Sequence, residues 1–278
     1  MRSETGTNDK ATIFARNRAR GSIELSVAEA AGRTRRRCVV EEGSLRIRLP
    51  DVGGAESEAV ILNTAGGIAG GDAFSIAIDA DEGARLTVIN AAAEKVYRTL
   101  GDASRIDVRL SVARGAALRW LPQETILFDG ARLQRSIDAD IADGGSLVIA
   151  ESTVFGRTAM GETVRHGELV DRWRIRKAGR LVFADTFRLG GEVAALLARP
   201  AAGGGAAACA SIVVAPGDEA VAEKVRSSLE ACSSEAGISA WNGIAVIRMC
   251  AKDAALLRRD LVLMLNHLGG ALPRLWTN

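Results

Sequence analysis

Histidines, aromatic residues and paired cysteines are scarce in this chain of 278 residues. There are two His, one Tyr, four Trp and six Phe. Two imidazoles are too few for a histidine-rich metal site, and so few rings argue against a platform that stacks single-stranded nucleic acid. The four cysteines, at positions 38, 209, 232 and 250, form no C-x-x-C pair. Their spacing therefore favours free thiols over a zinc site or a redox motif.

Net charge and long apolar runs are also lacking. The formal charge is +2, which gives no global basic field for nucleic acid. The local basic stretch at 33–37, RTRRR, is interpreted as a solvated loop. No apolar run approaches the ~20 residues that span a bilayer, and the polar N-terminus lacks the apolar core of a signal peptide. We expect a cytoplasmic protein whose residues 1–20 are a disordered tail.

What is present is a period-two alternation of apolar and polar residues across 44–190. Short runs such as Phe74, Ile76 and Ile78 on one face are followed by glycine-containing turns, as strands and tight turns require. A weak internal repeat recurs, with a leucine three residues after each glycine: Gly83 and Leu86, Gly115 and Leu118, Gly144 and Leu147. A period of about 30 residues predicts stacked coils. Coincidence in an alanine- and glycine-rich chain is the alternative.

The fold class predicted from these patterns is mainly β. We expect a coiled, β-helix-like (solenoidal) body over residues 21–200 and a small C-terminal α/β part carrying two helices. The stretch AAGGGAAACA, 201–210, is typical of a linker or loop. Residues 208–278 are predicted to form a strand–helix–strand–helix unit packed on the β body. In its second helix Leu257, Leu261, Leu265 and Leu268 recur at helical spacing.

The stretch NTAGGIAGGD, 63–72, is the most glycine-rich candidate for a phosphate loop. Asp72 stands where a phosphate loop carries lysine, and the dinucleotide fingerprint is also missing. A strand pattern follows instead of a helix. We therefore predict a turn between strands, in which glycines permit positive φ angles or a close approach of backbones.

Carboxylates offer the remaining chemistry. Glu94, Glu124 and Glu151 each follow the second strand of a repeat, so stacking would bring them together along one edge. Oxygen donors of this kind hold a divalent ion weakly and exchangeably. The alternative is that each caps a turn or pairs with a nearby cation: Lys95, Arg98 or Arg157.

A carboxylate-dependent hydrolase on a β-solenoid is the alternative function. Paired carboxylates perform acid–base work in glycoside hydrolysis. The aromatic platforms that usually hold sugars are missing from the sequence, and so is a G-x-S-x-G nucleophile motif.

Six motifs in series carry a resemblance to a known family. They are TAGGIAGGD, AAAEKVYRT, LPQETILFDGARL, ESTVFGRTAMGE, DRWRIR…GRLVFADTFRL and a terminal LPRLW. Together, from about residue 20 to 276, the chain resembles the urease accessory protein UreD, also called UreH. The resemblance implies a mostly β, coiled fold with two helices and no enzymatic activity.

The resemblance further implies a chaperone role in assembling the nickel centre of urease. Its partners would be a UreF-like helical protein, a UreG-like GTPase and the urease apoprotein. No permanent cofactor is implied, only transient Ni²⁺ guided through a water-filled passage. The residues that match family motif positions are candidates for passage lining or partner contacts: Asp72, Glu94, Lys95, Tyr97, Arg98, Glu124, Asp129, Glu151, Arg157 and Glu162. Glu94, Glu124 and Glu151 are the candidates for transient nickel ligands.

Overall fold

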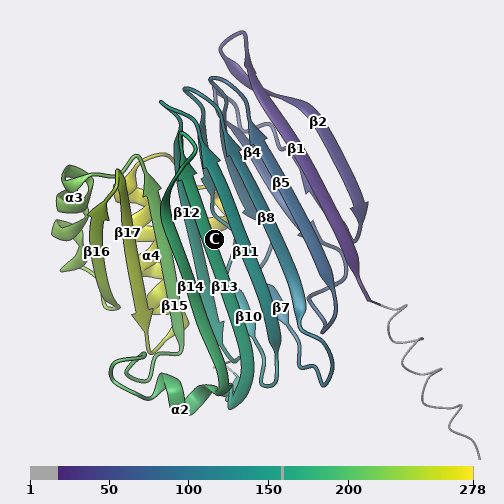
Figure 1. The fold of residues 1–278 in the computed structure, drawn as a ribbon, viewed down its shortest axis with the longest axis vertical. Helices are drawn as coiled ribbons and strands as arrows, with labels where there is room; N and C mark the ends of the chain where they lie inside the picture. The colour runs from purple at the N-terminus through teal and green to yellow at the C-terminus, as the bar shows by residue number, and fades with distance from the viewer. Residues whose placement is uncertain (1–17, 158–159, 278) are drawn as a thin grey trace, which may run out of the picture.

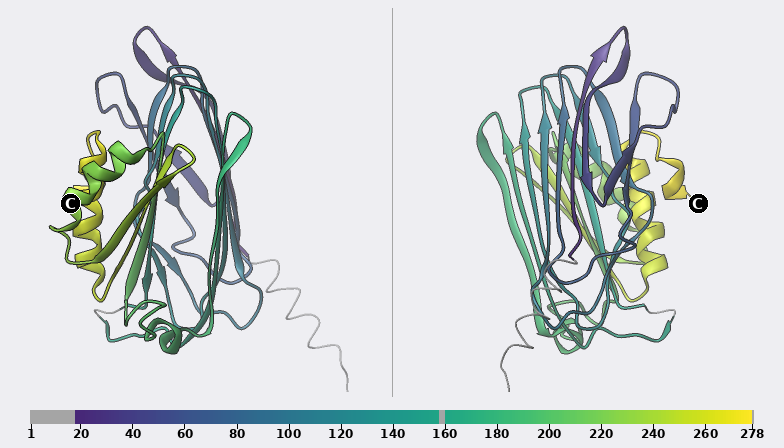
Figure 2. Two further views of the ribbon diagram at one scale, coloured as in Figure 1. Left: turned by 60° about the vertical axis from the view of Figure 1, so that its left-hand side comes forward. Right: turned by 90° about the vertical axis from the view of Figure 1, so that its right-hand side faces the viewer.

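Two β-sheets face each other, and two helices cover the outer side of the second sheet (Figure 1, Figure 2). This computed structural model describes residues 18–157 and 160–277. Most of the tail predicted for 1–20 lies outside the described residues, and the first strand begins at Arg20. Among the helices that the structure describes, none is long and apolar enough to cross a membrane.

The front sheet of Figure 1, sheet A, has seven strands. In spatial order they are β14 (Arg180–Glu192), β13 (His166–Lys177), β11 (Arg132–Ile141), β8 (Ser104–Val112), β5 (Ala73–Ala80), β1 (Arg20–Ala30) and β2 (Arg33–Gly43). The strands from β1 to β13 are parallel, whereas β2 and β14 are antiparallel to their neighbours. The basic stretch at 33–37 therefore belongs to an edge strand, and the loop interpretation was wrong.

The rear sheet, sheet B, has ten strands. Eight follow one order: β16 (Glu235–Trp241), β17 (Ile244–Ala251), β15 (Ala208–Ala215), β12 (Ser146–Phe155), β9 (Ala117–Trp120), β6 (Arg85–Asn90), β4 (Ser57–Asn63) and β3 (Leu45–Arg48). The short strands β7 (Glu94–Val96) and β10 (Thr125–Leu127) continue the pairing beside β12. The chain alternates between the sheets, so successive coils stack in parallel as a β-solenoid of about four turns.

The register confirms the repeat predicted from sequence. Leu86 lies opposite Leu118, which lies opposite Leu147 on the next strand. The glycines that precede these leucines also stack, since the Gly115 amide donates to the carbonyl of Gly144 at 3.2 Å. All three repeat glycines have φ between 69° and 75°, a region that costs other residues about 1–2 kcal/mol. The mainly β, solenoidal fold is confirmed.

The core lies between the sheets and is built by the predicted alternation. Ile78, Leu110 and Ala139 lie directly opposite one another at inner positions and are each at most 1% exposed. Side chains that point the other way from sheet B form a second apolar cluster with the helices, centred on Val225, Leu261 and residues of β15 and β17. The solenoid is thus stabilised by apolar burial on both faces of sheet B.

The C-terminal part extends sheet B rather than standing apart from it. Strand β15 pairs antiparallel with β12, and β17 pairs with β15. The helices are α2 (Val193–Leu197), α3 (Glu219–Leu229), α4 (Ala254–Leu268) and α5 (Arg274–Thr277). Between α3 and α4 the chain forms a hairpin of two strands, β16 and β17, where the sequence pattern indicated one.

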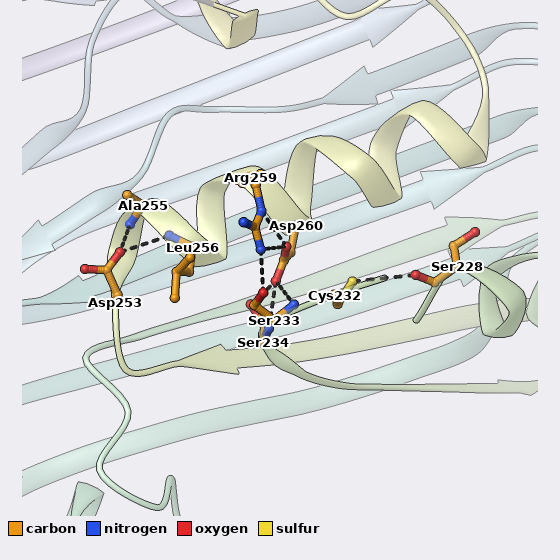
Figure 3. Close-up of polar contacts among 9 residues, drawn as sticks. All are labelled: Ser228, Cys232, Ser233, Ser234, Asp253, Ala255, Leu256, Arg259 and Asp260. Atoms are coloured by element: carbon orange, nitrogen blue, oxygen red, sulfur yellow. Dashed lines mark hydrogen bonds and ion pairs between the residues drawn. The ribbon is translucent and has the colours of Figure 1, made fainter. Parts of the chain in front are cut away.

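Helix α4 is fixed at its start and along its length by two aspartates (Figure 3). Asp253 caps it by accepting hydrogen bonds from the amides of Ala255 and Leu256. Asp260 is 1% exposed and accepts from the amides of Ser233 and Ser234 at 2.8 and 2.7 Å. This carboxylate therefore fastens the segment after α3 to α4.

The glycine-rich stretch is a turn between β4 and β5, as predicted. A Cβ atom on Gly67 would lie 2.5 Å from the ring of Tyr97, and one on Gly70 would lie 2.0 Å from the Thr99 hydroxyl. The Tyr97 hydroxyl donates to the carbonyl of Gly66 at 2.7 Å. Glycine is required here because the turn packs directly against the next coil.

Candidate functional site

A row of polar and thiol side chains crosses the inner face of sheet B. Its members lie directly opposite one another on six neighbouring strands: Glu94, Thr125, Thr153, Cys209, Cys250 and Glu235. We call this set the inner row. Because directly opposed residues point to the same face and strands lie about 4.8 Å apart, the row runs for about 24 Å. It begins at half-buried Glu94, passes two threonines that are each 4% exposed, and ends at exposed Glu235.

Glu94 begins the row at the glycine-rich turn. One of its carboxylate oxygens accepts a hydrogen bond from the side-chain amide of Asn63 at 3.1 Å. Burial raises the pKa of Glu94, and the Asn63 hydrogen bond opposes that shift. The same Asn63 amide also donates to the carbonyl of Gly67 at 3.0 Å, so the turn positions this carboxylate.

An ion-pair network connects the two sheets beside the middle of the row. Arg135 of β11 lies opposite Asp171 of β13 and makes two hydrogen bonds to it, at 3.0 and 2.5 Å. The Arg135 guanidinium also donates to Glu151, which points inward from β12. The indole nitrogens of Trp120 and Trp173 donate to Glu151 and Asp171, at 2.8 and 2.9 Å. Two tryptophans and one arginine thus satisfy two buried carboxylates.

The network holds one cation and two carboxylates, each at most 8% exposed. Burial and the charge of Asp171 together raise the pKa of Glu151 to about 7, against the opposing influence of Arg135. Glu151 is therefore an interior group whose charge changes near neutral pH.

Two small cavities and one open groove follow the inner row. The first cavity, of about 40 Å³, is lined by Glu94, Thr125 and the Arg135–Glu151 pair among others. The second, also about 40 Å³, is bounded by the same ion pair, with Thr153 and Cys209. Each exceeds the volume that a water molecule needs. Arg135 and Glu151 line both cavities and so stand between them.

The second cavity adjoins the outer groove, which measures about 590 Å³ and lies between β14 and the strands β15 to β17. Cys209 and Asp185 line both the cavity and the groove. Cys250 and Glu235, the last two members of the inner row, line the groove. The second cavity and the outer groove therefore lie next to each other along the inner row.

The structure separates the three glutamates that the sequence grouped. Glu94 and Glu151 point inward and line the first cavity. Glu124 lies on the opposite side of sheet B, where it pairs with Arg258 of α4 at 2.9 Å. In the part of the chain that the structure describes, no three His, Cys, Asp or Glu side chains are grouped as metal ligands. The expectation that Glu94, Glu124 and Glu151 would lie together was wrong for Glu124, whereas Glu94 and Glu151 share one cavity.

Three other candidates build the glycine-rich turn. Asp72 is 4% exposed and accepts from the amides of Ala19 and Ala69 at 2.8 and 2.7 Å. Lys95 contributes its carbonyl, which accepts from Ile68 at 2.7 Å, while its side chain is exposed. Tyr97 packs edge-on against Phe128, with ring centroids 5.2 Å apart. Through these contacts Asp72, Lys95 and Tyr97 stabilise the glycine-rich turn at 63–72 and its packing.

The last four candidates are Arg98, Asp129, Arg157 and Glu162. Arg157 contacts Phe128, the ring against which Tyr97 packs. Arg157 lies over the Phe128 ring at 4.3 Å and pairs with Glu162 at 2.8 Å. The hydrogen bond from Arg157 lowers the pKa of Glu162. Asp129 accepts from the amides of His166 and Arg165, which lowers its pKa.

Arg98 and Asp129 also line a separate surface groove of about 590 Å³. None of Arg98, Asp129, Arg157 and Glu162 lines the two interior cavities.

Sequence analysis missed Arg135, Asp171 and the two row cysteines. Arg135 and Asp171 could have been found from the alternation of apolar and polar residues along β11 and β13. Arg135 interrupts the apolar phase between Leu133 and Ile137, and Asp171 occupies the phase that Leu169 and Trp173 share. A charged side chain in the inward phase of a strand indicates a buried ion pair.

The chain is similar over nearly its whole length to known proteins. A family model described as "UreD urease accessory protein" matches residues 19–277. A urease accessory protein UreD of Bradyrhizobium diazoefficiens is 51% identical over 278 residues, covering all of both chains. Two such proteins of Rhodopseudomonas palustris, from strains BisA53 and BisB18, are 52% and 54% identical. Those alignments cover 98% and 96% of this chain and 95% and 96% of the relatives.

The fold and the inner row define a β-solenoid protein with a row of polar and thiol side chains between its sheets. The similarity spans nearly the entire chain at about half of its positions. The chain belongs to the UreD family of urease accessory proteins.

Proposed function

We propose that this chain takes part in urease maturation as a non-catalytic component that guides Ni²⁺ along the inner row. The observation that carries the proposal is the unbroken register from Glu94 to Glu235, flanked by two cavities and an open groove. Nickel is the cargo here and not a resident cofactor. The position of the row in a member of the UreD family connects it with urease.

The oxygen donors of Glu94, Thr125 and Thr153 suit transient passage of Ni²⁺ better than its tight storage. Carboxylate and hydroxyl oxygens with few imidazoles hold a borderline cation such as Ni²⁺ loosely. Glu94 supplies a carboxylate at the entrance, and Thr125 and Thr153 supply hydroxyls in the buried middle. Glu124 is not proposed as a nickel ligand here, because it pairs with Arg258 of α4 on the outer face of sheet B. It stays a candidate for a partner contact.

The partners in this proposal are the urease apoprotein, a UreF-like helical protein and a UreG-like GTPase. The GTPase must come from another chain, because the glycine-rich turn of this one carries Asp72 and no phosphate-loop lysine. The same proposal places the chain in the cytoplasm.

The hydrolase hypothesis finds less support in the geometry. It needs two carboxylates across one open cleft. Glu151 is 4% exposed and bound to Arg135, whereas Glu124 lines a different cavity against α4. These two side chains do not form such a pair.

Urease activation in cells tests the proposal. In cells that express urease, deletion of this chain should abolish the nickel-dependent gain of activity, and the parent chain should restore it. Thr153→Val removes one hydroxyl from the row at nearly constant volume, and we expect it to lower activation about tenfold. Ser152→Ala alters the opposite face of the same strand and is the matched control. Normal activation without the chain, or equal effects of the two variants, would overturn the proposal.

A further inference from the structure

The outer end of the inner row carries two thiols side by side. Cys209 of β15 lies directly opposite Cys250 of β17, and both line the outer groove. Each side chain is partly exposed, so both are accessible from the groove. The two cysteines are 41 positions apart in sequence, a spacing that forms no motif, and only the antiparallel pairing of these strands brings them together.

The cross-strand spacing suits a bridging ion better than a disulfide. Directly opposed residues have Cβ atoms about 4.5–5.5 Å apart, whereas a disulfide needs about 3.5–4.5 Å. Two sulfurs each bound at about 2.3 Å to one tetrahedral metal ion are about 3.7 Å apart, which side-chain rotation reaches from the wider spacing. The backbone register therefore presents a bidentate sulfur pair.

Carboxylates lie beside the thiol pair. The Glu235 carboxylate is 3.8 Å from the Cys250 sulfur. Asp185 lines the outer groove with both cysteines and pairs there with Arg248 at 2.6 Å. A metal ion must displace the thiol protons when it binds. Such competition with protons keeps binding exchangeable at neutral pH.

We propose that Cys209 and Cys250 bind one thiophilic divalent transition-metal ion at the outer mouth of the inner row. Two thiol protons leave to water as two sulfur–metal bonds form, and water completes the remaining coordination positions. The chelation stands on the strand register alone. Only the identification of the ion with nickel in transit rests on the proposed function.

Metal titration of the reduced, full-length chain tests the site. Cd²⁺ and Ni²⁺ should each produce a thiolate-to-metal charge-transfer absorption that saturates at one ion per chain. Cys209→Ser and Cys250→Ser should each lose it. Cys38→Ser and Cys232→Ser, which alter thiols outside the groove, are the matched controls and should retain it. Persistence of the absorption in Cys209→Ser or Cys250→Ser, or its absence in the parent, would overturn the site.

A second measurement uses the unaltered chain and does not depend on folding of a variant. Phenylarsine oxide joins two neighbouring thiols through two arsenic–sulfur bonds and releases one water. Peptide mapping should find the phenylarsenic group linking Cys209 to Cys250, and prior loading with Cd²⁺ should protect both. Linkage to any other cysteine contradicts the pairing.

Urease activation then separates this inference from the proposed function. Loss of metal binding together with loss of activation in Cys209→Ser supports both. Loss of metal binding with unchanged activation supports the site and contradicts its place on the nickel path. Unchanged metal binding overturns the site, whatever the urease assay gives.

Discussion

At the scale of single residues, one arginine pairs with two buried carboxylates in the interior. Arg135 reaches Asp171 within its own sheet and Glu151 across the interior. Removing one member of a buried ion pair leaves an uncompensated charge, which typically costs 3–5 kcal/mol. Arg135 and Glu151 line both interior cavities, so the contacts that connect the two sheets also separate these cavities.

The raised pKa of Glu151 predicts a pH-dependent stability. In the unfolded chain Glu151 ionises near its ordinary value of 4.5, and in the folded chain near 7. Between these values the folded state holds a proton that the unfolded state has lost. The free energy of unfolding should therefore fall as pH rises through this window, by up to about 3 kcal/mol from this group. Glu151→Gln removes that contribution.

Chemical denaturation of both proteins at several pH values measures the effect. The difference in unfolding free energy, parent minus Glu151→Gln, should decrease between about pH 4.5 and pH 7 and stay constant outside that range. Parallel profiles across the window would contradict a raised pKa.

Residue spacing predicted the repeat but misplaced one carboxylate. Glu94 stacks on Thr125, so Glu124 lies one position out of register. A shift of one residue in a strand turns a side chain to the opposite face. The spacing of the repeat gives the period of the solenoid. Which face of the sheet a side chain points to depends on the residue at which each strand begins, and the sequence pattern does not fix that residue.

At the scale of elements, α4 and the β16–β17 hairpin depend on one another. The apolar face of α4, with Leu257, Leu261 and Leu265 buried, follows the helical spacing seen in the sequence. Strand β16 was not predicted, because its EAGISAW segment has small residues in both phases and buries little: its residues are alternately exposed and half-buried. Its conformation is imposed by pairing with β17 and by packing of α3, which are tertiary effects.

Asp260→Ala should destabilise the protein by about 3 kcal/mol. The substitution leaves the amides of Ser233 and Ser234 without their acceptor, at a carboxylate that is 1% exposed (Figure 3). Asp253→Ala is the control on the same helix, since losing an N-cap costs about 1 kcal/mol. Urea unfolding monitored by tryptophan fluorescence compares them. Equal losses would show that Asp260 acts only as a local contact.

At the scale of the whole molecule, sheet B unites the coiled body with the C-terminal unit. The pairing of β12 with β15 runs from Leu147 to Val154, and the inner row continues across it without a break. Composition suggested a boundary near 201–210, but in the structure β15 begins at Ala208 and joins the same sheet. A change in composition marks a connection, and strand pairing decides whether two segments share a core.

Deletion of residues 208–278 should therefore yield an aggregated chain. It exposes the hydrogen-bonding edge of β12 and the apolar outer face of sheet B at Ala150 and Val154. Size-exclusion chromatography and binding of a hydrophobic dye measure the outcome, with deletion of residues 1–17 as the control. A monomeric product without dye binding would mean that the coils fold independently.

The direction of the outermost strands has a consequence for self-assembly. Parallel coils stack on a repeating template, and an open parallel end invites a second copy to continue the stack into a fibre. Here β2, β14, β3 and the β16–β17 hairpin, which terminate the two sheets, are all antiparallel to their neighbours. Exposed arginines at 35–37 add like charge to the β2 edge. At these four edges the reversed strands interrupt the parallel template on which a second copy would stack.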